Sequence, residues 1–144
     1  MPKMAPGNAP IFLVEDDPAH AELIMAGFKS LGIKEEIRHF TDGRTVLAQL
    51  NRDLEKTEGD SGSHLPGLIL LDLRLPTMDG LEILGKIKTS KQLNSVPVAI
   101  LSTSEAEEDK SEAKKLGADE YYTKPWSFDD LCQVLDEIHT RWIG

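Results

Sequence analysis

The chain has 144 residues, a length that suits one domain with one hydrophobic core, and its hydrophobic (40%) and charged (28%) fractions are ordinary for a globular protein. Its formal net charge of −9 disfavours nucleic acid and anionic membrane lipid as partners, and no apolar run approaches the length of a membrane span. Cys132 is the only cysteine, which excludes an internal disulfide and is typical of a protein of the reducing cytoplasm.

The first residues of the chain differ in composition from the rest. Residues 1–9 are rich in proline and lack the apolar stretch of a signal peptide, so we expect them to form a flexible tail. Residues 10–144 carry no internal repeat and are expected to form one domain.

Three apolar runs predict the central strands of a sheet, at residues 11–14, 68–71 and 98–101. Each run has four residues with polar or turn-forming neighbours, which is typical of a strand buried on both faces. Residues 36–40 alternate between apolar and polar, and residues 119–124 are only partly apolar, so both segments are predicted as edge strands.

Five helices are predicted between and after these strands. The first begins at Pro18 and ends at Gly32, the fourth covers residues 105–116, and residues 52–67 are predicted as a long polar loop after the second. The apolar residues that recur at helical spacing are Ile24, Phe28 and Leu31; Val46, Leu47 and Leu50; Leu81, Ile83, Leu84 and Ile87; Ala106, Ala113 and Leu116; and Phe128, Leu131, Leu135, Ile138 and Trp142.

The alternation of strands and helices predicts an α/β fold with a parallel sheet and helices on both of its faces. The more hydrophobic strands, the first, third and fourth, belong in the middle of that sheet. We therefore predict a flavodoxin-like (βα)5 doubly wound sheet with strand order 2-1-3-4-5.

Four of the strands end in residues that can carry chemistry, and the carboxyl ends of parallel strands meet at one edge of a sheet. These residues are Glu15, Asp16 and Asp17 after the first strand, Asp72 after the third, Ser102 at the end of the fourth and Lys124 after the fifth. Each residue taken singly is weak evidence for a site. Their common position at the binding edge of the sheet is much stronger evidence.

Charge indicates what such a site binds. Clustered carboxylates repel one another by about 4 kcal/mol per pair at 4 Å and an effective dielectric constant of 20, so they need a compensating cation. Oxygen ligands suit Mg²⁺, which could bridge Asp16, Asp72 and a phosphoryl oxygen. Lys124 and the Ser102 hydroxyl would then contact the other phosphoryl oxygens, with Asp72 as a nucleophile that forms an aspartyl phosphate.

The motifs "LVEDD", "LLDLRLPTMDG", "ILSTS" and "YYTKPWSFDDL" resemble the receiver domain of two-component response regulators over about residues 10–140. The long loop and the motifs are most similar to the single-domain response regulators that partner cyanobacterial phytochromes. The resemblance implies these roles: Asp72 as phosphoacceptor, Asp16 and the Arg74 backbone carbonyl as metal ligands, Glu15 in the outer shell of the metal, Ser102 and Tyr121 as switch residues, and Lys124 as the residue that pairs with the phosphate.

The resemblance also implies a cis peptide between residues 124 and 125, and dephosphorylation that is tuned by the residues at positions 74 and 104. The expected activity is acceptance of a phosphoryl group from a histidine kinase of the phytochrome type, with catalysis limited to the chain's own phosphotransfer and dephosphorylation. The kinase is expected to dock over the first helix at Ala19, His20 and Leu23.

Output is expected through protein contacts, because the sequence ends two residues after Trp142 and leaves no room for a DNA-binding domain. We predict a homodimer formed by the fourth helix, the fifth strand and the fifth helix. The fourth helix has few residues to bury, and Trp142 and Ile143 at the C-terminus have little chain after them to cover them.

Two other functions fit the fold. A flavin- or nucleotide-binding domain needs a turn rich in Gly, Ser or Thr after the first strand, whereas "EDDPAHAEL" at residues 15–23 is acidic and lacks glycine. A Mg²⁺-dependent phosphohydrolase of the haloacid dehalogenase type would use Asp72 as nucleophile and a second aspartate two residues later, where this chain has Arg74. A yellow colour would support the first function, and steady turnover of a phosphomonoester would support the second.

Overall fold

The computed structural model describes residues 9–59, 64–75 and 78–144. The predicted flexible tail, residues 1–9, lies outside these ranges except for Ala9. The elements in chain order are β1 (Ile11–Val14), α1 (Pro18–Ser30), β2 (Ile37–Phe40), α2 (Gly43–Gly59), β3 (Leu68–Leu71), α3 (Gly80–Thr89), β4 (Val98–Ser102), α4 (Glu107–Lys115), β5 (Glu120–Thr123) and α5 (Phe128–Trp142).

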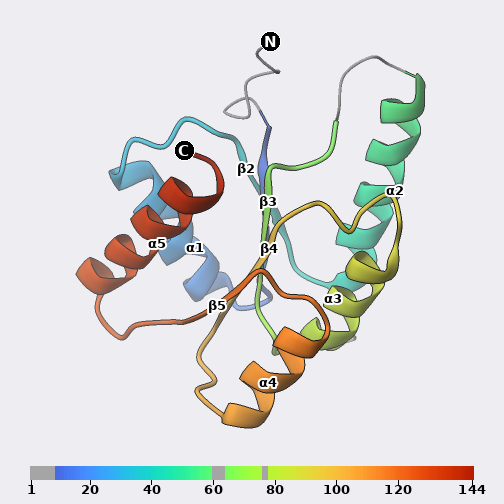
Figure 1. Ribbon diagram of the computed structural model, residues 1–144. Coiled ribbons are helices and arrows are strands. Elements are labelled where there is room, and N and C mark those ends of the chain that lie inside the picture. The colour runs from blue at the N-terminus through green and yellow to red at the C-terminus, as the bar shows by residue number, and fades with distance from the viewer. Residues whose placement is uncertain (1–8, 60–63, 76–77) are drawn as a thin grey trace.

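The described strands form one parallel sheet in the order β2-β1-β3-β4-β5, which confirms the predicted flavodoxin-like fold. Helices α1 and α5 cover one face of this sheet, and α2, α3 and α4 lie on the other side (Figure 1). The register places Val14 beside Leu71 and Leu71 beside Ile100, so the strands reach the same edge at nearly the same level. The residues that follow them are thereby brought together.

The sheet is buried because its central strands are apolar throughout. Every residue of β1, β3 and β4 is buried, and alternate side chains point to opposite faces. Phe12 and Val14 belong to the hydrophobic cluster under α2 and α3, whereas Ile11 and Leu13 belong to the cluster under α1 and α5. The two clusters hold the sheet between its layers of helices.

Two helices, α1 and α3, begin at capping residues beside the binding edge. Asp17 caps α1 by accepting a hydrogen bond from the Ala19 amide, and Pro18 occupies the first turn. Gly80 starts α3 directly against the Asp72 loop, where an added Cβ atom would lie within 2.4 Å of the Asp72 carbonyl oxygen. Only glycine permits this close approach, which fixes α3 to the end of β3.

At the amino ends of the strands, Lys88 near the end of α3 binds several segments together. Its ammonium donates to the carbonyl oxygens of Asn94 and Val96 and to a carboxylate oxygen of Asp119. Asp119 in turn accepts a hydrogen bond from the Val98 amide. These contacts connect α3 to the beginnings of β4 and β5.

The predicted polar loop at residues 52–67 is wrong over its first half, because α2 continues to Gly59. The local composition is polar, but Leu54 packs on the hydrophobic cluster beneath α2, and the Gln49 amide donates to the Asp53 carboxylate. A sparse apolar stripe and i,i+4 contacts therefore sustain a helix that is mostly exposed to solvent. Residues 60–63 lie outside the described ranges.

Two predicted core positions are less buried than expected. Ala106 precedes α4 and is exposed, and the Phe128 side chain at the start of α5 is 40% exposed. Trp142, by contrast, is half-buried and packs with Ile143 on the cluster under α1 and α5, so the C-terminus is covered better than predicted.

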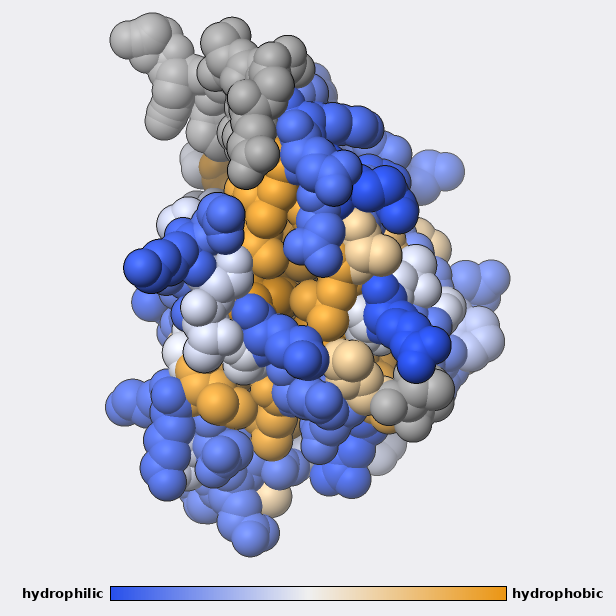
Figure 2. All heavy atoms as spheres, turned by 90° about the vertical axis from the view of Figure 1, so that its right-hand side faces the viewer, coloured by the Kyte–Doolittle hydropathy of each residue, from blue (hydrophilic) through white to orange (hydrophobic). Residues whose placement is uncertain are grey.

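The side of the molecule on the right of Figure 1 is mostly hydrophilic, with a band of hydrophobic residues visible between polar margins (Figure 2). Partly buried residues of α2 and α3, including Leu47 and Leu81, pack on the cluster beneath. Within the described ranges, no helix combines the length and apolar character that crossing a membrane requires.

Candidate functional site

The carboxylates predicted at the sheet edge do come together. Glu15, Asp16 and Asp72 each place one carboxylate oxygen within 4.8 Å of the others. The backbone holds two of them, because the Glu15 amide donates to the Phe40 carbonyl and the Asp72 amide donates to the Val14 carbonyl. The ladder of the sheet thus extends directly into the acidic cluster.

Lys124 is the cation of this cluster. Its Nζ atom donates to Oε1 of Glu15 at 2.5 Å and lies 3.5 Å from Oδ2 of Asp72. The side chains of all three residues are at most 8% exposed, so these charges interact in a site that is largely shielded from water. Lys124 thus lies at the acidic edge of the sheet, where its place after the fifth strand puts it, and Glu15 is its nearest carboxylate.

Two histidines that sequence reasoning did not assign to the site also contact it. His20, in the first turn of α1, accepts a hydrogen bond at Nδ1 from Lys124 Nζ at 3.1 Å. His39 on β2 places Nε2 2.7 Å from the Glu15 carbonyl oxygen. Helical spacing suggested a surface role for His20, and the alternation along residues 36–40 gave no signal for the role of His39.

Burial governs the protonation of Glu15. Desolvation raises its pKa above the ordinary value, and the negative charge of Asp72 acts in the same direction. The hydrogen bond and charge of Lys124 lower the pKa, without cancelling the effect of burial. Three carboxyl groups therefore gather around one lysine, and burial makes the charged form of Glu15 costly.

The donor set fits a divalent cation. It offers carboxylate oxygens from three residues, of which Asp16 is exposed and open to solvent. Hard oxygen ligands with excess negative charge suit Mg²⁺, Mn²⁺ or Ca²⁺. Asp17 is not part of this cluster, because its carboxylate caps α1, and the hydrogen bond from the Ala19 amide lowers its pKa.

The predicted switch residues, Ser102 and Tyr121, are connected through Ser104. The Ser102 hydroxyl is fully buried and accepts a hydrogen bond from the Ser104 amide at 3.2 Å. The Tyr121 hydroxyl donates to the Ser104 carbonyl oxygen at 2.8 Å. A movement of the Ser102 side chain would therefore be transmitted to Tyr121 through Ser104, a residue of the β4–α4 loop.

Arg74 lies next to Asp72 through its backbone and reaches α4 through its side chain. Its amide donates to Oδ1 of Asp72 at 3.4 Å, and Nη2 of its guanidinium lies 3.5 Å from Oδ2 of Asp109. The same Asp109 oxygen accepts a hydrogen bond of 2.5 Å from the Ser104 hydroxyl. No pattern in the sequence indicates this contact, because Asp109 stands in a polar helix with few residues to bury.

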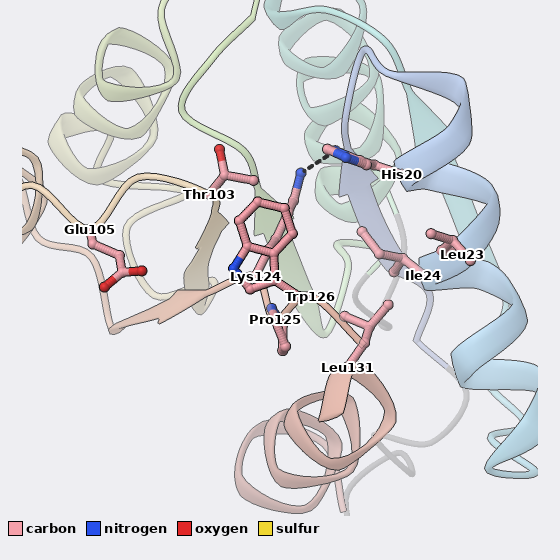
Figure 3. A pocket seen from close by; sticks show the side chains of 9 residues that line it. All are labelled: His20, Leu23, Ile24, Thr103, Glu105, Lys124, Pro125, Trp126 and Leu131. Carbon is pink, nitrogen blue, oxygen red and sulfur yellow. Dashed lines mark hydrogen bonds between the residues drawn. The ribbon is translucent and has the colours of Figure 1, made fainter. Parts of the chain in front are cut away.

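A pocket of about 170 Å³ opens beside Lys124. Figure 3 shows Lys124 and its hydrogen bond to His20 at one wall, with Leu23 and Ile24 of α1 nearby. Leu23 is 46% exposed, and Trp126, on the loop after β5, is fully exposed. The pocket wall is therefore apolar at its rim and charged at the end that meets the acidic cluster.

The predicted cis peptide between Lys124 and Pro125 is wrong, because the described part of the chain contains trans peptide bonds throughout. The trans form is favoured by about 0.5–1 kcal/mol even before proline, so a local sequence motif is a weak guide to the isomer. The Lys124 amide still donates to the Ser102 carbonyl at 2.7 Å, which keeps the ends of β4 and β5 together.

The sequence matches the response regulator receiver domain family over residues 11–136. The chain belongs to this family. Among its curated relatives is the probable methanogenesis regulatory protein FilR2 of Methanothrix harundinacea, which is 41% identical over 93% of this chain and 83% of its own length. The response regulator Rcp1 of Synechocystis is 35% identical over 92% of this chain and 88% of its own length.

Solved structures place this receiver domain close to phytochrome response regulators. The phosphorylated cyanobacterial phytochrome response regulator RcpA matches with a TM-score of 0.82 and 34% identity over 95% of each chain. The Mn²⁺-bound form of Rcp1 matches with a TM-score of 0.80 and 34% identity over 94% of this chain and 95% of its own. Family membership favours the receiver interpretation over a flavodoxin or a phosphohydrolase.

Proposed function

We propose that this receiver domain accepts a phosphoryl group from a histidine kinase onto Asp72 in a Mg²⁺-dependent reaction and signals through protein contacts. The observation that carries the proposal is the surroundings of the Asp72 carboxylate. One oxygen faces the ammonium of Lys124, and the other accepts the Arg74 amide. Both contacts orient the carboxylate that would act as the nucleophile.

The transfer breaks the bond between phosphorus and the donor nitrogen of a phosphohistidine and forms a bond between phosphorus and an Asp72 oxygen. Such a reaction depends mainly on positioning and on neutralisation of charge. Asp16, Asp72 and the Arg74 carbonyl would hold Mg²⁺, with Glu15 in its outer shell. The ion, when bound, neutralises charge on the phosphoryl oxygens and on the carboxylates.

Lys124 and Ser102 are the residues of the chain that would receive the new phosphoryl oxygens. Lys124 already lies within 3.5 Å of Asp72, and it exchanges Glu15 for the phosphoryl group when that group arrives. Within the described part of the chain, the Ser102 hydroxyl accepts one hydrogen bond, from the Ser104 amide, so it retains a proton to donate. Its movement would then reach Tyr121 through Ser104.

The proposal treats the chain as a phosphoacceptor rather than an enzyme with a separate substrate. The cytoplasm is the expected compartment, because a histidine kinase would deliver the phosphoryl group there. We propose a phytochrome as the light-sensing kinase, because RcpA is a phytochrome response regulator by its description. The kinase would dock at the pocket beside Lys124, over Ala19, His20 and Leu23.

We propose that the chain signals as a homodimer whose interface is formed by α4, β5 and α5. Among the described residues of α4, Ala113 is the one that is buried, which leaves most of the helix surface available. Trp142 and Ile143 are half-buried, so an uncovered C-terminus does not support this interface. The exposed surface of α4 remains the stronger support.

Labelling with acetyl phosphate and Mg²⁺ tests the function directly. Intact mass spectrometry is expected to show one added phosphoryl group on the wild type and none on Asp72→Asn. Asp79→Asn is the matched control, because Asp79 belongs to the same loop and caps α3 with a function that asparagine preserves. Undiminished labelling of Asp72→Asn would refute the assignment, and steady hydrolysis of a phosphomonoester would favour the phosphohydrolase instead.

A further inference from the structure

Asp109, in the first turn of α4, contacts two loops of the candidate site through a single oxygen atom. Its Oδ2 accepts the hydrogen bond from the Ser104 hydroxyl and lies 3.5 Å from the guanidinium of Arg74. Three segments therefore meet at this carboxylate: the loop after β3, the loop after β4, and α4. The phosphotransfer proposed above does not use it.

The two ends of Arg74 are held very differently. Its backbone amide donates to Asp72, so the residue is anchored beside the phosphoacceptor. Its side chain is 70% exposed and pairs with a carboxylate that is 27% exposed. Exposed ion pairs are weak, so the guanidinium can exchange Asp109 for a better partner within its reach.

A phosphoryl group on Asp72 is such a partner. It carries a charge of about −1.5 to −2, and a planar guanidinium binds its oxygens in a bidentate manner. Without Asp109, the Arg74 side chain would turn toward that group and cover its solvent side. Water would then approach the phosphorus less readily.

Resting on the proposed phosphorylation of Asp72, we propose that Asp109 is a positioning residue that holds the Arg74 guanidinium away from Asp72 and thereby shortens the lifetime of the aspartyl phosphate. The effect acts through water: hydrolysis needs a water molecule to approach the phosphorus in line, and a guanidinium lying over the solvent side of the phosphoryl group hinders that approach. Removal of Asp109 slows dephosphorylation.

The position of α4 controls this contact. Across the described residues of the helix, Ala113 supplies the buried contact, and its N-cap, Ala106, makes no side-chain capping bond. This end of the helix is therefore held mainly by the contacts of Asp109 with Ser104 and Arg74. A protein that binds α4 and withdraws Asp109 would lengthen the life of the signal to which it responds, which couples output binding to phosphate lifetime.

The test is a double-mutant cycle. The chain is phosphorylated with acetyl phosphate, the excess reagent is removed, and the rate at which the chain loses its phosphate is measured. Asp109→Asn is expected to slow the loss by about threefold to tenfold, and the effect is expected to disappear when Arg74→Gln is also present. Glu108→Gln is the matched control, since it removes the same charge from the adjacent, exposed position of α4 and leaves the rate unchanged. Asp109→Glu is expected to restore the wild-type rate.

Each other outcome has a definite meaning. If Asp109→Asn still slows phosphate loss when Arg74→Gln is also present, Asp109 acts without Arg74 and the inference is overturned. A rate of phosphate loss that is unchanged or faster in Asp109→Asn also overturns it. Arg74→Gln by itself gives a second measurement: it should alter the rate less than about twofold, because Asp109 already holds the guanidinium away. A larger change overturns the inference even if Asp109→Asn fails to fold. A wild type that takes no label on Asp72 refutes the proposed function and this inference together, whereas a labelled wild type with an additive cycle refutes the inference only.

Discussion

Lys124 contacts Glu15 more closely than it contacts Asp72, at 2.5 Å against 3.5 Å. The lysine that would pair with a phosphoryl group is thus held by a buried carboxylate before any phosphoryl group arrives. Both carboxylates belong to the acidic cluster, so a cation bound there would weaken the attraction of Glu15 for Lys124. Metal binding and release of the lysine are therefore coupled through Glu15.

The raised pKa of Glu15 predicts a pH-dependent stability. A carboxyl whose folded pKa exceeds its ordinary value of 4.5 contributes stability that is present below that value and lost as pH rises through the raised pKa. Glu15→Gln removes this loss and retains an acceptor for Lys124. In metal-free buffer, urea unfolding should show Glu15→Gln gaining stability relative to the wild type as the pH rises from about 4 to about 8.

Asp17→Asn provides the control of opposite sign. The Ala19 amide lowers the pKa of Asp17, so its carboxylate contributes stability above the ordinary value of 3.8 that is lost as pH falls through the lowered pKa. Relative to the wild type, Asp17→Asn should therefore lose stability with rising pH at the acid end. A Glu15→Gln variant that followed the same trend would contradict the dominance of burial at Glu15.

The affinity for Mg²⁺ should depend on the carboxylate of Asp16 and not on that of Asp17. Calorimetric titration with Mg²⁺ is expected to show affinity reduced by more than about tenfold in Asp16→Asn, because a direct oxygen ligand is lost. Asp17→Asn removes the same charge one residue away, from a carboxylate that caps α1, and is expected to retain the affinity. Equal losses in the two variants would show that the ion responds to overall charge rather than to ligation by Asp16.

The docking surface for the kinase can be tested at Leu23, which is 46% exposed at the rim of the pocket. Leu23→Glu is expected to slow phosphotransfer from a phosphorylated phytochrome kinase by at least about tenfold and to leave labelling by acetyl phosphate unchanged. Ser30→Glu, at an exposed position of the same helix outside the pocket, should slow neither reaction. Transfer at the wild-type rate in Leu23→Glu would place the kinase elsewhere.

Self-association through α4 should respond to reversal of charge on that helix. Sedimentation of the phosphorylated chain at several concentrations is expected to show a dimer that Lys114→Glu weakens. Lys29→Glu, on the exposed end of α1, should leave the dimer intact. Because exposed ion pairs are worth only about 0–1 kcal/mol each, the shift should be moderate. A monomer at every concentration would leave a different protein as the output partner.

The sheet could be predicted from sequence because its signal is local. Runs such as Leu68–Leu71 are short, wholly apolar and bounded by polar residues, and their relative hydrophobicity ranks the strands from centre to edge. The second half of α2 could not be predicted in this way. Leu54 is an isolated apolar residue in a polar segment, and only the tertiary contact with the core shows that the helix continues.

The site residues at the strand ends were predictable for a related reason: the topology brings the ends together, whatever the side chains do. The partners of those residues were not predictable. Whether Lys124 contacts Glu15 or Asp72 first depends on the path of a long side chain, and the contact between Asp109 and Arg74 joins segments 35 positions apart. Sequence patterns place residues at an edge, and packing decides which atoms meet.

The opposite ends of α4 differ in how they are attached. At its C-terminal end, the Ala118 amide donates to Ala113, and Gly117 adopts a φ of 101° against the Lys88 side chain, whose ammonium is bound to Asp119. That end is therefore fixed by backbone contacts, whereas the end beside the phosphoacceptor is held through the side chain of Asp109. A small displacement at the aspartyl phosphate would become a rotation of the whole helix about Gly117, so that the surface offered to a partner changes in direction rather than in composition.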